Sequence, residues 1–393
     1  MSEPTVAIIT TAKSTFSKPL YEAFSNAQPK GWKTLLIWPE NLTSEHPAES
    51  VTPRAENLEI QLVPPRPLSL PGWRRNPVDQ ARHWQVSLPT AAQWRILRTR
   101  DIRAIIIHEY SLYTVQALIY AKLHRIPAIV STELGCRNGH FFSWRTRLWH
   151  RFWGHFADGI IACSPAAHQP LSKCATPSFS AYHAVDSRIY LPKEPANRMS
   201  DSVVFVYLGQ LIFRKGLDLF LRAAAILRAQ TSQQFCVRLI GGGDQSWILR
   251  LVAELNLEPH VELTGFLSGP AIREALGSAD VFVLPTREDT YAAVVHEAAC
   301  LGLPLLVSKY AGASEALVEE GRNGFVFDPD NLYQFVDRLK RLLSAATREE
   351  MGAASRLIGE SHSAHHRGSA LWEWMHAKFI IPASDRGTTS RRA

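Results

Sequence analysis

The chain has 393 residues, of which 46% are apolar, and a formal net charge of +7. This length exceeds one ordinary domain and fits two, each with a sizeable core. No apolar run could span a membrane, no basic segment precedes the short apolar run near the N-terminus, and the five cysteines form no paired motif. We therefore expect no membrane span, signal peptide, structural zinc or disulfide framework, which fits a reducing cytoplasm.

Short apolar runs alternate with amphipathic stretches along the whole chain. In the first half they predict a helix over 113–123 and strands over 6–11, 34–38, 104–107, 128–131 and 160–162. In the second half they predict strands over 203–208, 236–240, 261–263, 281–284, 304–308 and 324–327, with helices between most of them. Continuous apolar strands alternating with helices indicate parallel sheets covered on both faces, so we predict two doubly wound α/β domains.

The two series meet at a polar, proline-bearing stretch over 192–200. We therefore place an N-terminal domain over 1–195 and a C-terminal domain over 196–360. A helix over 361–381 is expected to follow, which could pack back on the first domain. The polar tail over 382–393 is expected to be disordered.

The charge is uneven between the halves of the chain. Residues 1–200 hold 23 Lys and Arg against 14 Asp and Glu, whereas residues 201–393 hold 20 against 22. Residues 137–156 contain no acid and combine four arginines with three tryptophans and four phenylalanines. Their apolar positions near helical spacing suit a helix at an anionic membrane surface: Phe141, Leu148, Phe152 and Phe156. A core helix with a solvated basic face is the alternative, and no recognised module indicates nucleic-acid binding.

Two segments of the second half place glycines and cations directly after strands. Gly209 lets the backbone turn, and Arg214 and Lys215 stand just before a helix predicted over 217–230. Because a helix N-terminus favours anions, the two cations suit a phosphate, although a solvated loop would account for them equally well. The glycine run 241–243 allows close approach of a ligand or of another backbone.

Asp289 and Glu297 lie near the start of a helix predicted over 291–301. Asp289 falls at the approach to this helix and Glu297 about two turns inside it. An ionised carboxylate accepts hydrogen bonds from two vicinal hydroxyls, so both acids suit a sugar. A surface acid is the alternative for Glu297, but its neighbours are apolar and a carboxylate there is costly unless it is used.

In order and spacing these segments resemble the C-terminal domain of the retaining glycosyltransferases of family 4. The segment from Gly209 to Gly216, the glycine run 241–243, the segment 261–265 and the acid-x7-Glu pair each match. Further matching positions follow: Gly302, Pro304, Ser308, Gly312, Glu315, Gly321, Asn323 and Gly324. The resemblance covers 200–345 strongly and 100–200 weakly. It implies a GT-B fold, in which two doubly wound Rossmann-like domains face each other across a cleft.

The resemblance also implies how a nucleotide-sugar donor would bind. Lys215 would contact the diphosphate with help from Arg214, and Glu297 would bind the ribose. Asp289 or Glu288 would meet the transferred sugar, and this choice stays open. The other donor contacts implied are Gly209, Gln210, Gly241, Gly243, Thr290, Tyr291 and Ala292, with Gln210 replacing the arginine usual in the family. Because fixed cations can stabilise the leaving diphosphate, no metal and no other cofactor is expected.

By the same resemblance the N-terminal domain would bind the acceptor. Thr11, Lys13 and Ser14 follow the first strand and could contact a phosphate or a sugar, although the family's glycines are missing there. His108 and Glu133 follow the next two strands of this region, and either could orient the reacting sugar. A histidine at the edge of the core and a loop acid are the alternatives.

The activity implied is the transfer of a hexose from a nucleotide sugar to a saccharide or lipid-linked acceptor, with retention of anomeric configuration. Such a reaction would serve cell-envelope, exopolysaccharide or glycolipid biosynthesis, in the cytoplasm or at the inner face of the membrane. Two alternatives stay open. One is an NDP-sugar 2-epimerase of similar fold, and the other is a non-catalytic protein that scaffolds a partner.

Overall fold

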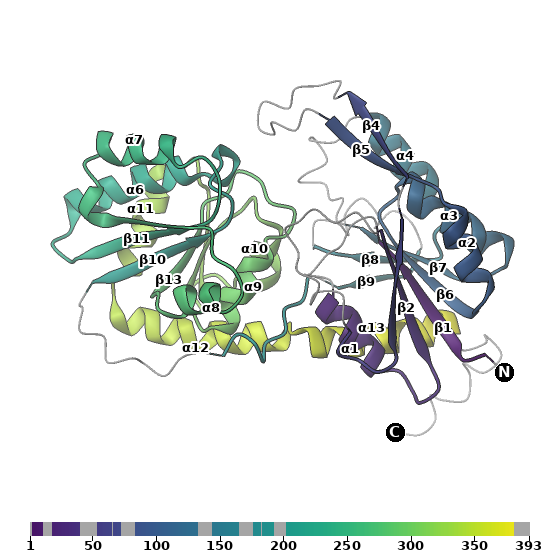
Figure 1. The fold of residues 1–393 in the computed structure, drawn as a ribbon. Helices are drawn as coiled ribbons and strands as arrows, with labels where there is room; N and C mark the ends of the chain where they lie inside the picture. Colours follow the sequence, from purple (N-terminus) through teal and green to yellow (C-terminus); the bar gives the residue numbers. More distant parts are fainter. Residues whose placement is uncertain are drawn as a thin grey trace. The chain divides into compact units, whose positions relative to one another are not determined.

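The computed structural model describes residues 2–10, 18–39, 53–64, 66–71, 83–132, 144–164, 176–181, 183–191 and 202–380. They form two compact units, each built on its own parallel sheet (Figure 1). Unit 1 comprises the described residues up to Ala184 together with those from Ala364 onward, and unit 2 runs from Val185 to Ser363. The chain therefore passes from unit 1 to unit 2 and back again. The polar tail over 382–393 lies outside the described residues.

Unit 1 is built on a seven-stranded parallel sheet with the order β3-β2-β1-β6-β7-β8-β9. The order reverses between β1 and β6, which is the doubly wound arrangement. The strands are β1 (Pro4–Ile9), β2 (Lys33–Pro39), β3 (Leu58–Val63), β6 (Asp101–His108), β7 (Ala128–Thr132), β8 (Gly159–Ala162) and β9 (Ser178–Ser180). A separate antiparallel pair is formed by β4 (Arg66–Pro71) and β5 (His83–Leu88).

Helices cover both faces of this sheet. On one face lie α1 (Lys18–Asn26) and α13 (Ala364–Met375), and on the other lie α2 (Ala91–Arg98) and α3 (Leu112–Leu123). The unit is completed by α4 (Trp144–Gly154) and by a π-helical turn, η4 (His376–Ile380). Because both faces are covered, β1 is apolar throughout: its even-numbered residues Val6 and Ile8 join one core cluster, and Ala7 and Ile9 join the other.

The contact between α1 and α13 ties the last helix to the first part of the chain. The Phe24 and Trp372 rings meet edge to face at 5.7 Å between centroids. The two backbones also approach closely, since a Cβ built at Gly368 would lie 2.6 Å from the backbone nitrogen of Phe24. The two helices therefore form a single packed layer, although more than 300 residues of chain separate them.

Unit 2 repeats the doubly wound plan with a six-stranded parallel sheet in the order β12-β11-β10-β13-β14-β15. The strands are β10 (Val203–Leu208), β11 (Phe235–Ile240), β12 (Val261–Gly265), β13 (Val281–Leu284), β14 (Leu305–Ser308) and β15 (Gly324–Phe327). The helices are α6 (Leu217–Gln230), α7 (Ser246–Glu254), α8 (Pro270–Gly277), α9 (Ala293–Cys300), α10 (Gly312–Leu317), α11 (Leu332–Arg341) and α12 (Ala345–Ser361). The switch point, where ligands of open α/β sheets bind, lies between β10 and β13.

The predicted strands are confirmed in both units, and those over 203–208, 281–284 and 324–327 have the bounds expected. Four strands were not predicted, namely β3, β4, β5 and β9. The sequence of β3, LEIQLV, has polar residues because it lies at the edge of its sheet, and β9 has only three residues. Neither gives a continuous apolar signal. Within the described ranges, no helix combines the length and the apolar character needed to cross a membrane.

Candidate functional site

Two glycine turns meet at the carboxyl ends of β10 and β11. Gly209 N–H donates to Ile240 O at 3.0 Å, and Leu211 N–H donates to Gly242 O at 2.9 Å. A Cβ built at Gly241 would lie 1.8 Å from the carbonyl oxygen of Gly209. Gly241 is therefore required by the close approach of the two turns, which is one of the two interpretations that the sequence left open.

A third glycine brings the start of α6 against the end of β13. Gly216 adopts the left-handed conformation at φ 71°, directly after the 3-10 turn η2 (Phe213–Lys215). A Cβ at this position would lie 2.0 Å from the carbonyl oxygen of Pro285. Glycine is thus needed at position 216 for the backbone to turn from η2 into α6 beside Pro285. This turn brings Lys215 next to the segment that holds Glu288 and Asp289.

Lys215 Nζ forms an ion pair with Asp289 Oδ2, and the two side chains are only 13% and 16% exposed. Asp289 is held through its backbone, because its N–H donates to Tyr310 O and its carbonyl accepts from Gly312 N–H, each at 3.1 Å. An anionic ligand at this point would compete with the Asp289 carboxylate for the ammonium. The switch point of unit 2 therefore holds one cation, Lys215, and one acid, Asp289, that an anionic ligand could displace from this cation.

Glu288 and Arg214 meet differently. Arg214 Nη1 donates at 3.1 Å to the backbone carbonyl of Glu288, and Arg214 O accepts from Arg287 N–H at 2.9 Å. Arg214 thus joins η2 to the segment after β13 through both its side chain and its backbone. Of the two acids that the sequence could not distinguish, Asp289 is the one that meets the cation.

Arg287 stabilises the η2 turn. Its guanidinium makes a bidentate pair with Asp218 at 2.7 and 2.8 Å and lies 4.0 Å from the centroid of the Phe213 ring. Bidentate geometry and ring stacking are characteristic of arginine, so a lysine would not substitute for it. Sequence reasoning missed this residue, because its partner lies 69 positions away.

Tyr207 links the glycine turn to the ion pair. Its hydroxyl, on the fifth residue of β10, donates to Gln210 O at 2.8 Å. Burial raises the pKa of Tyr207, and the nearby Asp289 carboxylate raises it further. Gln210 thus contributes its backbone carbonyl to the turn. A tyrosine at the end of an otherwise apolar strand was the available signal for this residue, and it was not used.

Glu297 lies on α9 and is 6% exposed. It is the fifth residue of this helix, so it lies about one turn inside, and the expectation of two turns was wrong. The reason is that Ala292 adopts a left-handed conformation at φ 70°, which delays the helix to Ala293. Burial raises the pKa of the Glu297 carboxyl to about 7, and a hydrogen bond from Tyr190 acts in the opposite direction.

The loop that joins Asp289 to α9 is fixed by backbone contacts. Tyr291 O accepts from Ala313 N–H at 2.8 Å, and a Cβ at Gly312 would lie 2.1 Å from Thr290 O. His296, fully buried on α9, accepts from Val185 N–H at Nδ1 (3.3 Å), and its Nε2 lies 2.8 Å from Gly359 O. The helix that carries Glu297 is therefore held from several sides.

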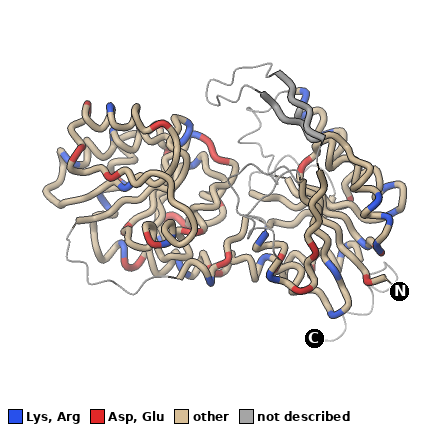
Figure 2. Tube along the Cα trace, viewed as in Figure 1, with Lys and Arg blue, Asp and Glu red and all other residues tan. Residues whose placement is uncertain are grey.

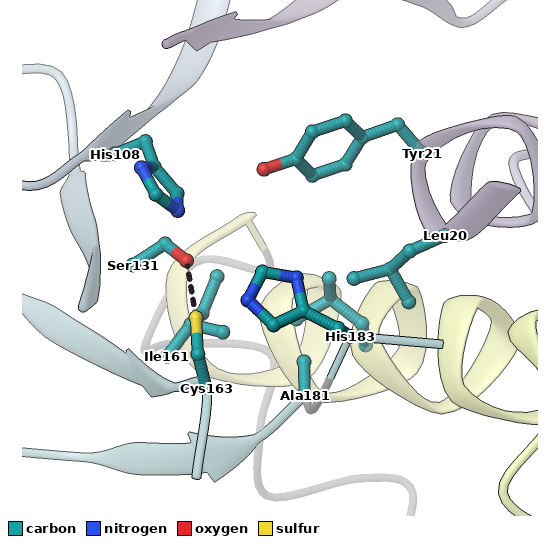
Figure 3. Close-up of a pocket in the computed structure, with 9 residues that line it drawn as sticks. Leu20, Tyr21, His108, Ser131, Ile161, Cys163, Ala181 and His183 are labelled. Atoms are coloured by element: carbon teal, nitrogen blue, oxygen red, sulfur yellow. Dashed lines mark hydrogen bonds between the residues drawn. The ribbon is translucent and has the colours of Figure 1, made fainter. Parts of the chain in front are cut away.

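His108 lines a small pocket of unit 1. It ends β6 and shares the pocket with Ser131 of β7, Cys163 after β8, His183 after β9 and Tyr21 of α1. Figure 3 shows the Tyr21, His108 and His183 side chains turned toward the same space, with Ser131 Oγ and Cys163 Sγ 3.2 Å apart. Apolar walls complete the pocket: Leu20, Ile161, Ala181 and Leu371. It lies at the carboxyl ends of parallel strands, where open α/β sheets bind ligands.

Glu109, the residue after His108, adopts a left-handed conformation at φ 58°. Its carboxylate accepts from Thr132 Oγ1 at 3.1 Å and lies 3.7 Å from Nδ1 of His150 on α4. Burial lowers the pKa of His150 to about 4, so this imidazole is neutral near pH 7. A non-glycine residue in this conformation is costly and fixes the direction of the chain beside His108.

Four predicted residues lie outside the described ranges, namely Thr11, Lys13, Ser14 and Glu133. Among the residues that the structure does describe, no group of three or more His, Cys, Asp or Glu side chains is arranged to hold a metal ion. The predicted charged residues that the structure describes fall into three sets. Lys215, Arg214, Glu288 and Asp289 come together beside the glycine turns, Glu297 meets Tyr190, and His108 lies in unit 1.

Comparison with known sequences connects this geometry to a family. Residues 193–357 match the family model described as "Glycosyl transferases group 1". Sulfoquinovosyl transferase SQD2 of Arabidopsis thaliana is 26% identical over 295 residues, which cover 67% of this chain and 56% of that protein. The GDP-mannose-dependent alpha-(1-6)-phosphatidylinositol monomannoside mannosyltransferase of Mycolicibacterium smegmatis is 26% identical over 262 residues, which cover 60% of this chain and 65% of that protein. The chain thus matches less than two thirds of the length of each relative.

Comparison with solved structures concerns the fold. Anabaena Alr3699/HepE in complex with UDP and glucose has a TM-score of 0.68 and 16% identity, covering 95% of this chain and 100% of that one. Sucrose-phosphate synthase of Thermosynechococcus elongatus has a TM-score of 0.65 and 15% identity, covering 96% of this chain and 99% of that one. With the two parallel sheets, these neighbours confirm the GT-B fold. The family model and the relatives show that this part of the chain is similar to glycosyltransferases of group 1.

Proposed function

We propose that the protein transfers a hexose from a nucleotide sugar to a saccharide or lipid-linked acceptor, with retention of configuration, as the family 4 enzymes do. The observation that carries this proposal is the Lys215–Asp289 pair beside the glycine turns of unit 2. It lies at the switch point of the sheet and within the segment that matches the family model. Ligands of doubly wound sheets bind at this point.

The geometry supports the following division of roles in the donor site. The donor diphosphate would displace the Asp289 carboxylate from Lys215 and rest against η2, where Arg214 adds a second cation. As the bond to the sugar breaks, negative charge develops on the diphosphate, and these fixed cations stabilise it. Asp289, released from Lys215, would accept hydrogen bonds from hydroxyls of the transferred sugar. Protein cations in these positions make a divalent metal unnecessary in the proposed reaction.

Glu297 is proposed to bind the ribose of the donor. A carboxylate can hold two vicinal hydroxyls, and α9 places this one in a buried position. Because the pKa of Glu297 is about 7, the acid loses its charge below neutral pH. Donor binding should therefore strengthen as the pH rises through 7, since the ionised acid accepts hydrogen bonds better than the neutral one.

The acceptor is proposed to bind on unit 1 at the His108 pocket. This pocket offers imidazole and hydroxyl groups at the carboxyl ends of its strands, which suits a sugar hydroxyl. A lipid-linked acceptor is supported by one of the relatives, whose name specifies a phosphatidylinositol monomannoside. The corresponding pathway would be cell-envelope, exopolysaccharide or glycolipid biosynthesis.

Donor binding is tested first, by thermal shift with a panel of UDP-, GDP- and ADP-sugars. A donor at about 100 times its dissociation constant should stabilise the protein by about 2.7 kcal/mol. Lys215→Met should abolish this shift. Lys122→Met is the matched control, because Lys122 also pairs with an acid, Asp158, but lies in unit 1. The donor assignment fails if no nucleotide sugar raises Tm, or if both variants respond like the wild type.

Transfer is tested with the donor that binds. Release of nucleoside diphosphate should require a saccharide or glycolipid acceptor, and the anomeric configuration of the product, read by NMR, should equal that of the donor. Appearance of a C2-epimerised nucleotide sugar without any acceptor would instead identify an epimerase. A protein that binds no donor and turns over no acceptor would be a scaffold.

A further inference from the structure

The helix α4 presents a row of apolar side chains at the surface of unit 1. Trp144, Leu148, Phe152 and Phe156 follow one another at intervals of four residues and are 64%, 58%, 54% and 41% exposed. Side chains four residues apart share one helix face, and Phe156 continues the row just past the last turn. Single exposed apolar residues are ordinary, but a contiguous row marks an interaction surface. We call these four residues the α4 stripe.

The neighbouring face of α4 packs against unit 1 and so fixes the direction of the stripe. Trp149 and Trp153 pack against the core of unit 1, and Trp149 Nε1 donates to Tyr110 O at 2.5 Å. The Phe152 and Trp153 rings meet edge to face at 5.2 Å between centroids. The helix therefore has two apolar faces, of which one is used by the core and the other is turned outward.

The charges around the stripe identify what would cover it. Arg145, Arg147 and Arg151 are exposed on α4, which carries basic but no acidic residues (Figure 2). The Arg145 guanidinium lies 5.5 Å from the centroid of the Trp144 ring. No acid occurs in the sequence from Leu134 to Ala157. A second copy of the chain would bring like charges together, which disfavours a symmetric dimer through this face.

We infer that α4 lies in the interface of an anionic phospholipid membrane. The stripe would enter the boundary between head groups and acyl chains, and the arginines would contact the lipid phosphates. Tryptophan and arginine are the residues that favour this zone. Trp149 of α4 is hydrogen-bonded to Tyr110, which lies two residues after His108. The helix α4 and the His108 pocket therefore belong to one packed unit. Binding to vesicles can be measured without donor or acceptor, so its result is independent of the proposed function.

The test is flotation of the full chain with vesicles of phosphatidylcholine, with and without phosphatidylglycerol. Wild type should bind only the anionic vesicles. Each arginine near an anionic surface contributes about fivefold to the binding constant, so replacing Arg145, Arg147 and Arg151 by Gln should weaken binding on the order of 100-fold. Replacing the same three residues by Lys keeps the charge and should restore binding to within a few-fold. Leu148→Ser with Phe152→Ser should weaken binding at least about tenfold.

Matched controls remove the same charge, or two exposed apolar side chains, elsewhere. Lys30→Gln, Arg222→Gln and Lys340→Gln together change three exposed cations outside α4, and Leu249→Ser with Leu357→Ser changes two exposed leucines of unit 2. Both controls should bind as the wild type does, and circular dichroism should show all variants folded. Equal binding to neutral and anionic vesicles would overturn the inference. So would stripe variants that bind normally, or a wild-type dimer that the stripe variants convert to monomers.

Discussion

Replacing Glu297 by Gln should make unit 2 more stable in alkaline solution. The carboxyl is 6% exposed, and burial raises its pKa from 4.5 to about 7. A raised carboxyl pKa means that ionisation is disfavoured in the folded state. The contribution of Glu297 to the free energy of unfolding is therefore fully present below pH 4.5 and is lost as the pH rises through 7. At 1.36 kcal/mol per pKa unit, the full loss is about 3 kcal/mol.

The assay is thermal unfolding of wild type and variant at about pH 5 and about pH 8.5, compared as the difference in Tm. The amide cannot ionise, and its oxygen still accepts from the Tyr190 hydroxyl. Between these two pH values the wild type loses about 2–3 kcal/mol of stability that the variant keeps, so the difference in Tm should grow by roughly 5–10 °C in favour of Gln. Comparing two pH values cancels any constant cost of the substitution.

Glu350→Gln is the matched control, because this acid is exposed on α12 of the same unit. Its Tm difference from wild type should not change with pH. The reasoning is refuted if the Glu297→Gln difference is equally flat, or if it grows toward acid. The stabilised variant should nevertheless lose the donor-induced shift in Tm, since a neutral amide is a poorer acceptor for two ribose hydroxyls.

Three further outcomes are expected. Lys215→Met should lower the transfer rate roughly 10²–10³-fold, measured as diphosphate release at the donor concentration that saturates the wild type, and a rate within a few-fold of wild type would exclude this residue from the site. Gly216→Ala should cost at least about 2 kcal/mol in urea unfolding, because its Cβ would strike Pro285 O, whereas Gly269→Ala, also at positive φ but with open space around it, should cost less. Ser111→Ala removes one half of the capping box of α3 and should cost about 1 kcal/mol; an unchanged midpoint would show that this cap contributes nothing.

The strands of unit 2 could be predicted from sequence because both faces of its sheet are covered, which makes most of them apolar runs bounded by glycine or proline. Lys215 and Asp289 could be predicted because both lie in segments that follow such strands. Their pairing could not, since it depends on Gly216 lying against Pro285. The sequence also left Glu288 and Asp289 equivalent, and the ion pair of Asp289 with Lys215 distinguishes them.

Other parts of the candidate site had no local pattern. Tyr190 reaches Glu297 across more than a hundred residues, and it belongs to neither a helix nor a strand. His108 was identified from its place after a strand, but Tyr21, Cys163 and His183 join it from three other elements. Contacts of this kind depend on strand order, which apolar runs alone do not specify.

The return of α13 to unit 1 has a consequence for how the chain acquires its structure during synthesis. Unit 2 is one continuous stretch and can close as soon as it has been translated, whereas α1 must wait for a helix that is made after all of unit 2. Until then the apolar face around Phe24 is uncovered, and this half is open to aggregation or to capture by a chaperone. A nascent chain arrested before Ala364 should therefore protect its second half from protease while its first half is still digested.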